Sequence, residues 1–99
     1  MLKRAAIEEA LRHLAPKTPR HEFEAIVDHA LSSPGLRTAA PGSAAWLSLV
    51  AYVRHVFTEY DALLAEGYDP DSARFFVAGE INDVLERWGA RRKVEVDEP

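Results

Sequence analysis

Residues 43–67 read SAAWLSLVAYVRHVFTEYDALLAEG, and this stretch decides the fold. Apolar residues recur in it at steps of three and four, which places them on one face of a helix. They are Trp46, Leu49, Val50, Val53, Phe57, Tyr60 and Leu64. Ser43 suits the N-cap position, and Gly67 suits the position that follows the last turn. The pattern therefore predicts one long amphipathic helix over residues 43–67.

Other apolar residues make the buried face of this helix broad. Leu47, Val56 and Leu63 widen it well beyond the narrow seam of a coiled coil. We therefore expect other helices to contact this one on more than one side, as in the central helix of a bundle.

Two shorter helices are predicted before the central one. Residues 2–15 carry an apolar stripe and are followed by a proline, which disfavours further helix. Thr18 is a suitable N-cap and Pro19 a suitable first residue for a second helix that ends near residue 32. The two prolines and two glycines of residues 33–42 then predict a loop.

A last helix is predicted from Pro70 to Trp88, antiparallel to the central one. Asp69 can cap its start, and Gly89 can end it. Gly79 lies in the helix interior, where glycine is unfavourable, so we expect another element to approach the backbone there.

These elements predict an all-α fold. It is a four-helix, bundle-like single domain over residues 1–93, with a long central helix and a short N-terminal helical hairpin. A chain of 99 residues with 47% hydrophobic content suits one core. We expect residues 94–99 to be a flexible acidic tail.

Composition excludes several kinds of chemistry. The chain has no cysteine, so disulfides, thiolate metal sites and thiol nucleophiles are excluded. Its four histidines, at positions 13, 21, 29 and 55, do not have the spacing of metal ligands, and we expect neither a metal nor a cofactor.

No window approaches the roughly 20 apolar residues of a membrane span, and the charged N-terminus does not suit a secretory signal. We expect a cytoplasmic protein without membrane contact.

The polar face of the central helix carries the candidate site. Arg54, Thr58 and Asp61 follow one another at helical spacing, with His55 and Glu59 one step around the helix. Such a ladder is either an ordinary solvated face or a binding surface, and the pattern favours the solvated face.

Arg74 is expected to join this site from the last helix. An antiparallel hairpin would place its guanidinium beside Tyr60 and Asp61, and we predict an Arg74–Asp61 ion pair. The candidate ligand- or partner-binding residues are Arg54, His55, Thr58, Tyr60, Asp61 and Arg74. No catalytic residue is assigned, because the sequence contains neither a nucleophile elbow nor a phosphate-binding glycine loop.

Charge and exposed aromatic residues suggest two kinds of partner. The net charge is −4, but the first twenty residues and the cluster Arg91, Arg92 and Lys93 are basic, which leaves contact with nucleic acid open. Phe75 is predicted on the polar side of the last helix, and with Trp88 it suggests an interface with a second copy or another protein.

The segment AYVRHVFTEYDALLAEGYDPDSARFFVAGEINDVLERWG, residues 51–89, resembles a family of bacterial domains of unknown function. These are short proteins of alphaproteobacterial type, and a related domain occurs in fungal proteins. The resemblance extends upstream through PRHEFEAIVDHALSSPGLR. It rests on Arg54-His55, Thr58, Tyr60-Asp61, Leu63-Leu64, Ala73-Arg74 and the VLERW that ends at Trp88. It implies no activity or substrate, but it groups the six candidate residues as the polar signature. Phe57 stands where the family often has a second histidine.

The sequence therefore predicts a small cytoplasmic protein that acts as a non-enzymatic protein-interaction module, with a protein partner or a second copy bound. One alternative is a nucleic-acid-associated accessory protein that uses the basic termini. Another is a small-ligand or enzymatic site around Arg54, His55, Tyr60, Asp61 and Arg74.

Overall fold

The central stretch forms two helices instead of one. The computed structural model describes residues 3–96, and in it α3 (Pro41–Phe57) ends before α4 (Tyr60–Ala65) begins. Between them Thr58 has an extended backbone, with φ −133° and ψ 172°. Its hydroxyl donates to the carbonyl of Arg54 and accepts the N–H of Tyr60 at 3.2 Å. The Thr58 side chain thus forms hydrogen bonds with backbone groups on both sides of the break. The prediction of a single helix over residues 43–67 is wrong at residues 58–59.

The rest of the described chain has the three other predicted helices and one short 3₁₀ turn in the segment predicted to be a loop. It contains α1 (Lys3–Leu14), α2 (Arg20–Ser32), the short 3₁₀ turn η1 (Pro34–Leu36) and α5 (Pro70–Arg87). The all-α prediction is confirmed, with five α-helices in residues 3–96 because the central one is divided. None of the helices in this range has the length and apolar character needed to cross a bilayer.

Two helix starts differ from the predicted ones. α3 begins at Pro41, two residues before Ser43, because proline's fixed φ and missing N–H suit the first helical position. The N-cap of α2 is Pro19 and not Thr18. The Thr18 hydroxyl instead donates to the carbonyl of Ala15 at 2.7 Å, at the end of α1.

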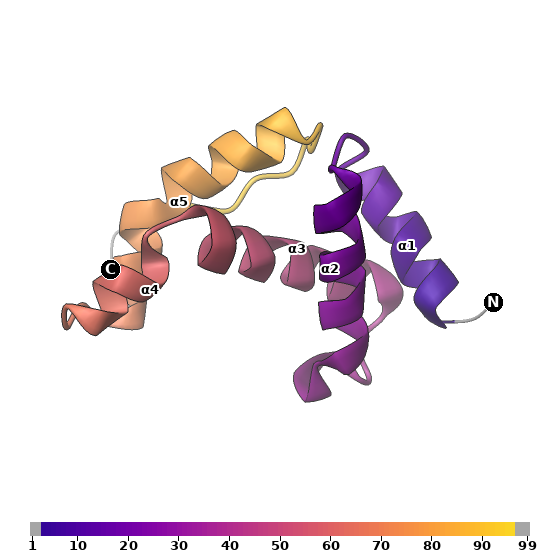
Figure 1. Cartoon of the computed structure of the whole chain (residues 1–99), viewed down its shortest axis with the longest axis horizontal. Coiled ribbons are helices and arrows are strands. Elements are labelled where there is room, and N and C mark those ends of the chain that lie inside the picture. Colours follow the sequence, from indigo (N-terminus) through magenta and orange to yellow (C-terminus); the bar gives the residue numbers. More distant parts are fainter. Residues whose placement is uncertain (1–2, 97–99) are drawn as a thin grey trace.

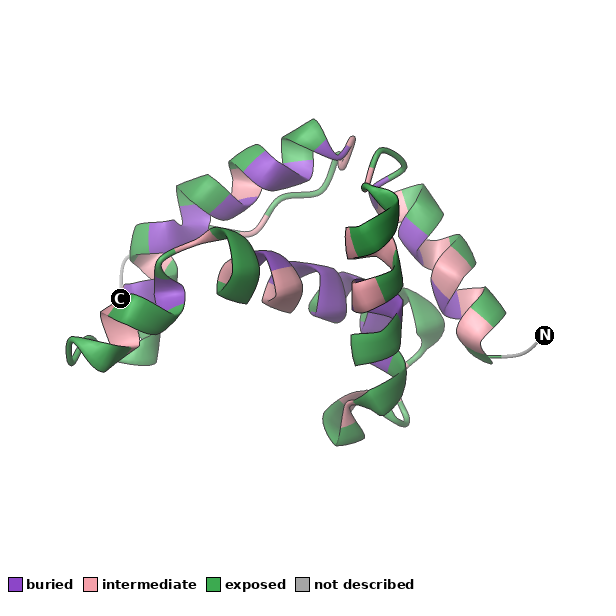
Figure 2. Ribbon diagram, in the orientation of Figure 1, coloured by how far each residue is buried: buried purple, intermediate pink, exposed green. Residues whose placement is uncertain are grey.

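The helices pack around α3, which crosses the middle of the molecule (Figure 1). α1 and α2 pack against α3 at its N-terminal side, and α5 runs back in the direction opposite to α3. One part of the core lies between α3 and the pair α1 and α2, and another lies between the buried faces of α3 and α5 (Figure 2). α4 and the first turns of α5 form a hairpin arm at the end away from the N-terminus, so the molecule is elongated, 43 × 28 × 23 Å. The largest fully buried apolar side chains are Ile7, Leu11, Ile26, Leu49, Ile81 and Leu85.

The buried face of α3 includes other residues than the sequence predicts. Leu47 and Val56 are 51% and 54% exposed, so the expectation that they widen the core is wrong. Ser48 is fully buried in their place, since α1 and α2 cover the side of the helix that it shares with Ala44 and Ala45. Its hydroxyl has no hydrogen-bond partner among the described residues.

The end of α5 is fastened to the turn between α1 and α2. The N–H of Lys17 donates to the carbonyl of Trp88 at 2.8 Å. Gly89 follows with φ +82°, and a Cβ there would lie 3.2 Å from Cγ of Pro16. Glycine is therefore required twice over, by its backbone angle and by the close approach. Gly79 is different: no neighbouring atom lies within 4 Å of its Cβ position, so the predicted close approach there is wrong.

The chain after α5 folds back along the helix. Asn82 binds the backbone of Val94 through both amide atoms, accepting from its N–H at 2.8 Å and donating to its carbonyl at 3.1 Å. Arg92 lies over the ring of Trp46, with its guanidinium carbon 4.1 Å from the ring centroid. Two side-chain hydrogen bonds thus hold Val94, the first residue of the segment expected to be a flexible tail, and residues 97–99 lie outside the described chain.

The start of α5 is capped as predicted. Asp69 accepts the N–H of Ser72 at 2.8 Å and its hydroxyl at 3.1 Å, and Pro70 is the first helical residue. These donors lower the pKa of the Asp69 carboxyl, with the backbone N–H as the largest cause. Because the charged form is the better cap, Asp69 stabilises the folded state at neutral pH.

Replacing Gly89 by alanine is expected to lower the free energy of unfolding by about 2 kcal/mol, through the positive φ and the contact with Pro16. Gly79→Ala is the matched control, and it should raise the free energy by about 0.5–1 kcal/mol because the position is helical and open. Urea denaturation of both variants measures the difference. Equal effects of the two substitutions would contradict the structural role of Gly89.

The Asp69 cap predicts a pH dependence of stability. Because the folded-state pKa is lowered, the advantage of wild type over Asp69→Asn is fully present above the ordinary pKa of 3.8. It should shrink as the pH falls through the lower folded-state value. Melting temperatures of both proteins between neutral pH and acid test this, and a gap that widens in acid would refute it.

Candidate functional site

His55 and Asp61 meet across the break between α3 and α4. Nδ1 of His55 lies 2.8 Å from a carboxylate oxygen of Asp61, and the imidazole packs edge-on against the ring of Tyr60 at 5.4 Å. His55 lies in the last turn of α3 and Asp61 in the first turn of α4. The break at Thr58 therefore creates this pair, which a continuous helix would arrange differently. Both side chains remain about half or more exposed, 49% and 62%.

Arg54 stacks on the ring of Tyr60, the same ring that the His55 imidazole contacts. Its guanidinium carbon lies 5.4 Å from the ring centroid, and Tyr60 itself is buried. The Nε atom of Arg54 is buried and has no acceptor among the described residues. Burial lowers the pKa of the guanidinium; Tyr60 opposes this by raising it, and the positive charge of Arg74 lowers it. Arg54 stays protonated at neutral pH, because arginine starts from a pKa far above it.

Arg74 does not bind Asp61. Its guanidinium pairs with Asp71, three residues earlier on the first turns of α5, while Asp61 is held by His55. The predicted Arg74–Asp61 pair is wrong because both carboxylate and guanidinium find partners nearer in the chain. Arg54, His55, Thr58, Tyr60 and Asp61 do come together, and Arg74 acts on them only through its charge near Arg54.

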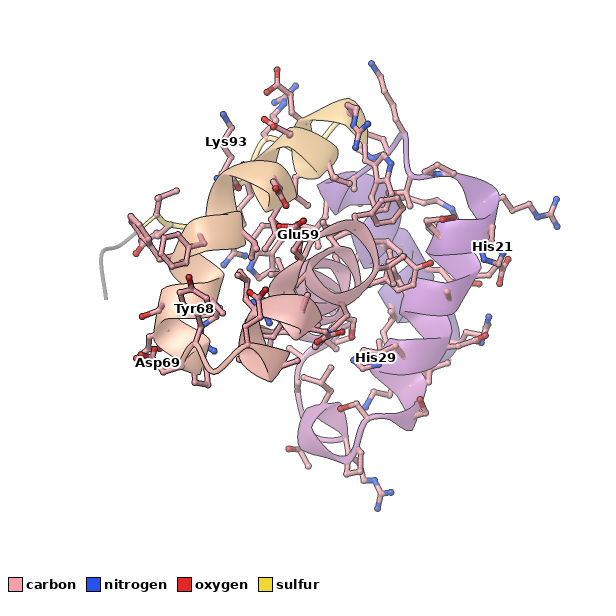
Figure 3. The ribbon with its side chains drawn as sticks, turned by 60° about the vertical axis from the view of Figure 1, so that its left-hand side comes forward. His21, His29, Glu59, Tyr68, Asp69 and Lys93 are labelled. Atoms are coloured by element: carbon pink, nitrogen blue, oxygen red, sulfur yellow. The ribbon has the colours of Figure 1, made fainter. Side chains whose placement is uncertain are left out.

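The cluster can orient an imidazole and present positive charge. The Asp61 carboxylate accepts a hydrogen bond from Nδ1 of His55 and so fixes the ring, as a carboxylate does in general acid–base sites. The nearby Thr58 hydroxyl is already donated to the carbonyl of Arg54, so it is not poised as a nucleophile for His55. In residues 3–96 no group of three or more His, Asp or Glu side chains is placed to hold a metal ion. His21 and His29 both lie on the exposed side of α2, as Figure 3 shows.

The aromatic candidates are placed differently from the prediction. Trp88 is only 7% exposed and packs edge-on against Phe57 at 5.5 Å, so it belongs to the core and not to a surface patch. Phe75 is half-buried. Of the two adjacent phenylalanines, Phe76 is the exposed one, at 56%, and it packs edge-on against Tyr68 at 5.5 Å. The three side chains Tyr68, Phe75 and Phe76 form what we call the aromatic patch.

The basic residues of α1 mostly face away from the C-terminal cluster. Arg4 is paired with three carboxylates, Glu8, Glu24 and Asp28, at 3.0–3.5 Å, which joins α1 to α2. Lys3 donates to backbone carbonyls near η1. His13, in the last turn of α1, shares a cleft with Arg91 and Arg92.

A second cleft lies between α3 and the returning C-terminal chain, and we call it the C-terminal cleft. Its volume is about 440 Å³. It is lined by Trp46, Leu47, Val50, Arg54, Arg92, Lys93, Val94 and Glu95. A larger open groove of about 710 Å³ lies beside α5 and is lined mainly by its charged residues. Sequence reasoning missed the C-terminal cleft, because it depends on Asn82 holding a segment that has no helical pattern.

One comparison with known proteins identifies the family. Residues 10–89 match the family described as Uncharacterized conserved protein (DUF2293). The chain belongs to the DUF2293 family. The expected resemblance to a family of unknown function is confirmed at this level. No curated protein and no solved structure matches the chain.

The DUF2293 match covers α2 to α5 and ends at Gly89. All six polar candidates lie inside it, as does the aromatic patch. Arg92 and Lys93, which line the C-terminal cleft, lie beyond its end. The family description assigns no activity to any of these residues.

The hydroxyl of Thr58 is expected to stabilise the junction of α3 and α4. Thr58→Ala removes both of its hydrogen bonds and should lower the free energy of unfolding by about 1 kcal/mol. Thr38→Ala is the matched control, since Thr38 is exposed on a loop and should change stability by less than about 0.5 kcal/mol. Chemical denaturation measures both, and equal stabilities of wild type and Thr58→Ala would refute the role of the hydroxyl.

Proposed function

We propose that this DUF2293 protein is a non-enzymatic, cytoplasmic protein-interaction module whose partner binds the aromatic patch. The observation that supports this is the exposure of the patch: Phe76 and Tyr68 are 56% and 44% exposed. The two rings contact each other edge-on, and Phe75 lies 5.7 Å from Phe76. Adjacent exposed rings that also brace one another are typical of the central contacts of protein interfaces.

The position of the patch supports the same conclusion. Tyr68 lies in the turn between α4 and α5, beside Asp69, at the far end of the hairpin arm (Figure 3). Asp69 and Asp71 are exposed at the start of α5, with Asp69 next to Tyr68 and Asp71 one turn before Phe75, so they place negative charge beside the rings. An apolar centre with a charged rim is the common arrangement of a protein-binding surface.

The rings lose little freedom when a partner binds. Phe76 is held on a helix and against Tyr68, and aromatic side chains have only two rotatable bonds. Burial of the exposed part of such rings is favourable at about 25 cal/mol per Å² of apolar area. A partner with an apolar pocket and a basic rim facing Asp69 and Asp71 would complement this surface.

The His55–Asp61 pair fits this role better than a catalytic one. The pair is exposed, and the hydroxyl nearest to it is engaged with the backbone. Enzyme sites generally hold their acid–base groups in a cleft that excludes water. The pair is better explained as a contact that fixes α4, and with it the arm, relative to α3.

A photocrosslinking experiment tests the proposal. p-Benzoylphenylalanine placed at position 76 should crosslink the protein in cells, either to itself or to another protein, and mass determination separates the two outcomes. The matched control places it at position 31, where Leu31 is 38% exposed at the end of α2 and far from the arm along the chain. Sedimentation of Phe76→Glu and wild type over a range of concentrations then tests whether a second copy is the partner.

Phe76→Glu should abolish the interaction and change the stability of the single chain by no more than about 1 kcal/mol, because the ring is more than half exposed. Leu31→Glu should leave the interaction intact. No crosslink at position 76 above that at position 31, together with a strictly monomeric wild type, would refute the proposed function.

A further inference from the structure

The C-terminal cleft gathers positive charge that forms no ion pair with the described part of the chain. Arg54, Arg92 and Lys93 line it, against the single carboxylate of Glu95. In residues 3–96, no ion pair involves any of the three cations. The lining residues therefore carry a net charge of two positive units at neutral pH, which suits a doubly charged anion.

Both arginines are held in a similar way, by the face of an aromatic ring. Arg54 lies over Tyr60 at 5.4 Å and Arg92 over Trp46 at 4.1 Å. Stacking uses the face of a guanidinium and leaves the N–H donors in its plane available to an acceptor. It also fixes the side chains before a ligand arrives, which reduces the entropy lost on binding.

Arg54 is the member of the cleft that most lacks a partner. Its Nε atom is buried without an acceptor, and its terminal nitrogens donate to no described residue. The charge of Arg74 adds repulsion. A partly buried cation next to a like charge is unfavourable, and an anion supplying oxygen acceptors relieves the repulsion.

The cleft also has an apolar wall, which suits a ligand with an apolar part. Leu47, Val50 and Val94 are apolar and lie in the same lining as the three cations. Leu47 is 51% exposed, so part of the apolar wall is open to a ligand. A volume of about 440 Å³ admits a small organic molecule.

We propose that the C-terminal cleft binds the phosphate monoester group of a small molecule through Arg54, Arg92 and Lys93. A monoester carries a charge of about −1.5 to −2 at neutral pH and three oxygen acceptors. This matches two arginine forks and one ammonium, whereas a phosphodiester carries a single charge. The proposal is independent of partner binding at the aromatic patch, which lies on the hairpin arm.

NMR titration of the full chain with phenyl phosphate tests the proposal at constant ionic strength. Saturable shifts are expected at Arg54 Nε–H and at the backbone N–H groups of residues 92–95, with inorganic phosphate as a competitor. Arg92→Gln, at an exposed position, should weaken binding on the order of tenfold, because a charge-assisted fork is lost. Arg54→Gln should weaken it at least as much, and melting curves confirm that each variant is folded.

Arg37→Gln is the matched control, since Arg37 is an exposed arginine next to η1 and outside the cleft. It should bind phenyl phosphate as wild type does. Absence of saturable shifts, or equal binding by wild type and Arg92→Gln, would overturn the proposal. Tighter binding of a short single-stranded oligonucleotide than of phenyl phosphate, lost in Arg92→Gln, would also overturn it in favour of nucleic acid.

Discussion

The break at Thr58 is the constraint on which the functional half of the molecule depends. A threonine hydroxyl that bonds to the preceding turn and to the following one ends α3 and redirects the chain into α4. The change of direction buries Tyr60 under Arg54 and brings Asp61 to His55. It also sets the course of the hairpin arm, and so the place of the aromatic patch. A straight helix through residues 58–59 would lose all of these contacts together.

Much of the fold could be predicted from hydrophobic spacing and helix-end signals. Helical periodicity located α1, α2, α5 and most of α3, and Asp69 and Gly89 were recognised as ends. The break was missed because the apolar spacing continues through it. A weak signal was present in the sequence: Thr58 and Asp61 have the spacing of a capping box, although in the structure Glu59 is the N-cap and Asp61 binds His55 instead.

The sequence predicted most of the residues of the candidate site, but not all of the contacts between them. Five of its six polar residues gather, but the Arg74–Asp61 pair does not form, because Asp71 lies one turn from Arg74 on the same helix. Local partners of this kind compete with a distant one at little entropic cost. Which of Phe75 and Phe76 is exposed depends on the rotation of α5 about its axis, and two adjacent phenylalanines do not fix that rotation. The C-terminal cleft depends on a side-chain clamp far along the chain, which no periodicity reveals.

The two proposed surfaces differ in how they are supported. The aromatic patch rests on the hairpin arm, where α4 and α5 brace each other. The cleft is assembled from α3 and a segment without secondary structure, so tertiary contacts bring Arg54 to the neighbouring residues Arg92 and Lys93.

The amide of Asn82 has a consequence beyond fixing one residue. It holds Val94 by two hydrogen bonds, much as a neighbouring strand would, in a chain whose described part contains no strand. If that clamp opens, the segment that carries Arg92 and Lys93 can leave α3 while the helices stay folded. Amide hydrogen exchange at Val94 would then be faster than in the helices, and the cleft would be lost and restored without unfolding of the helical core.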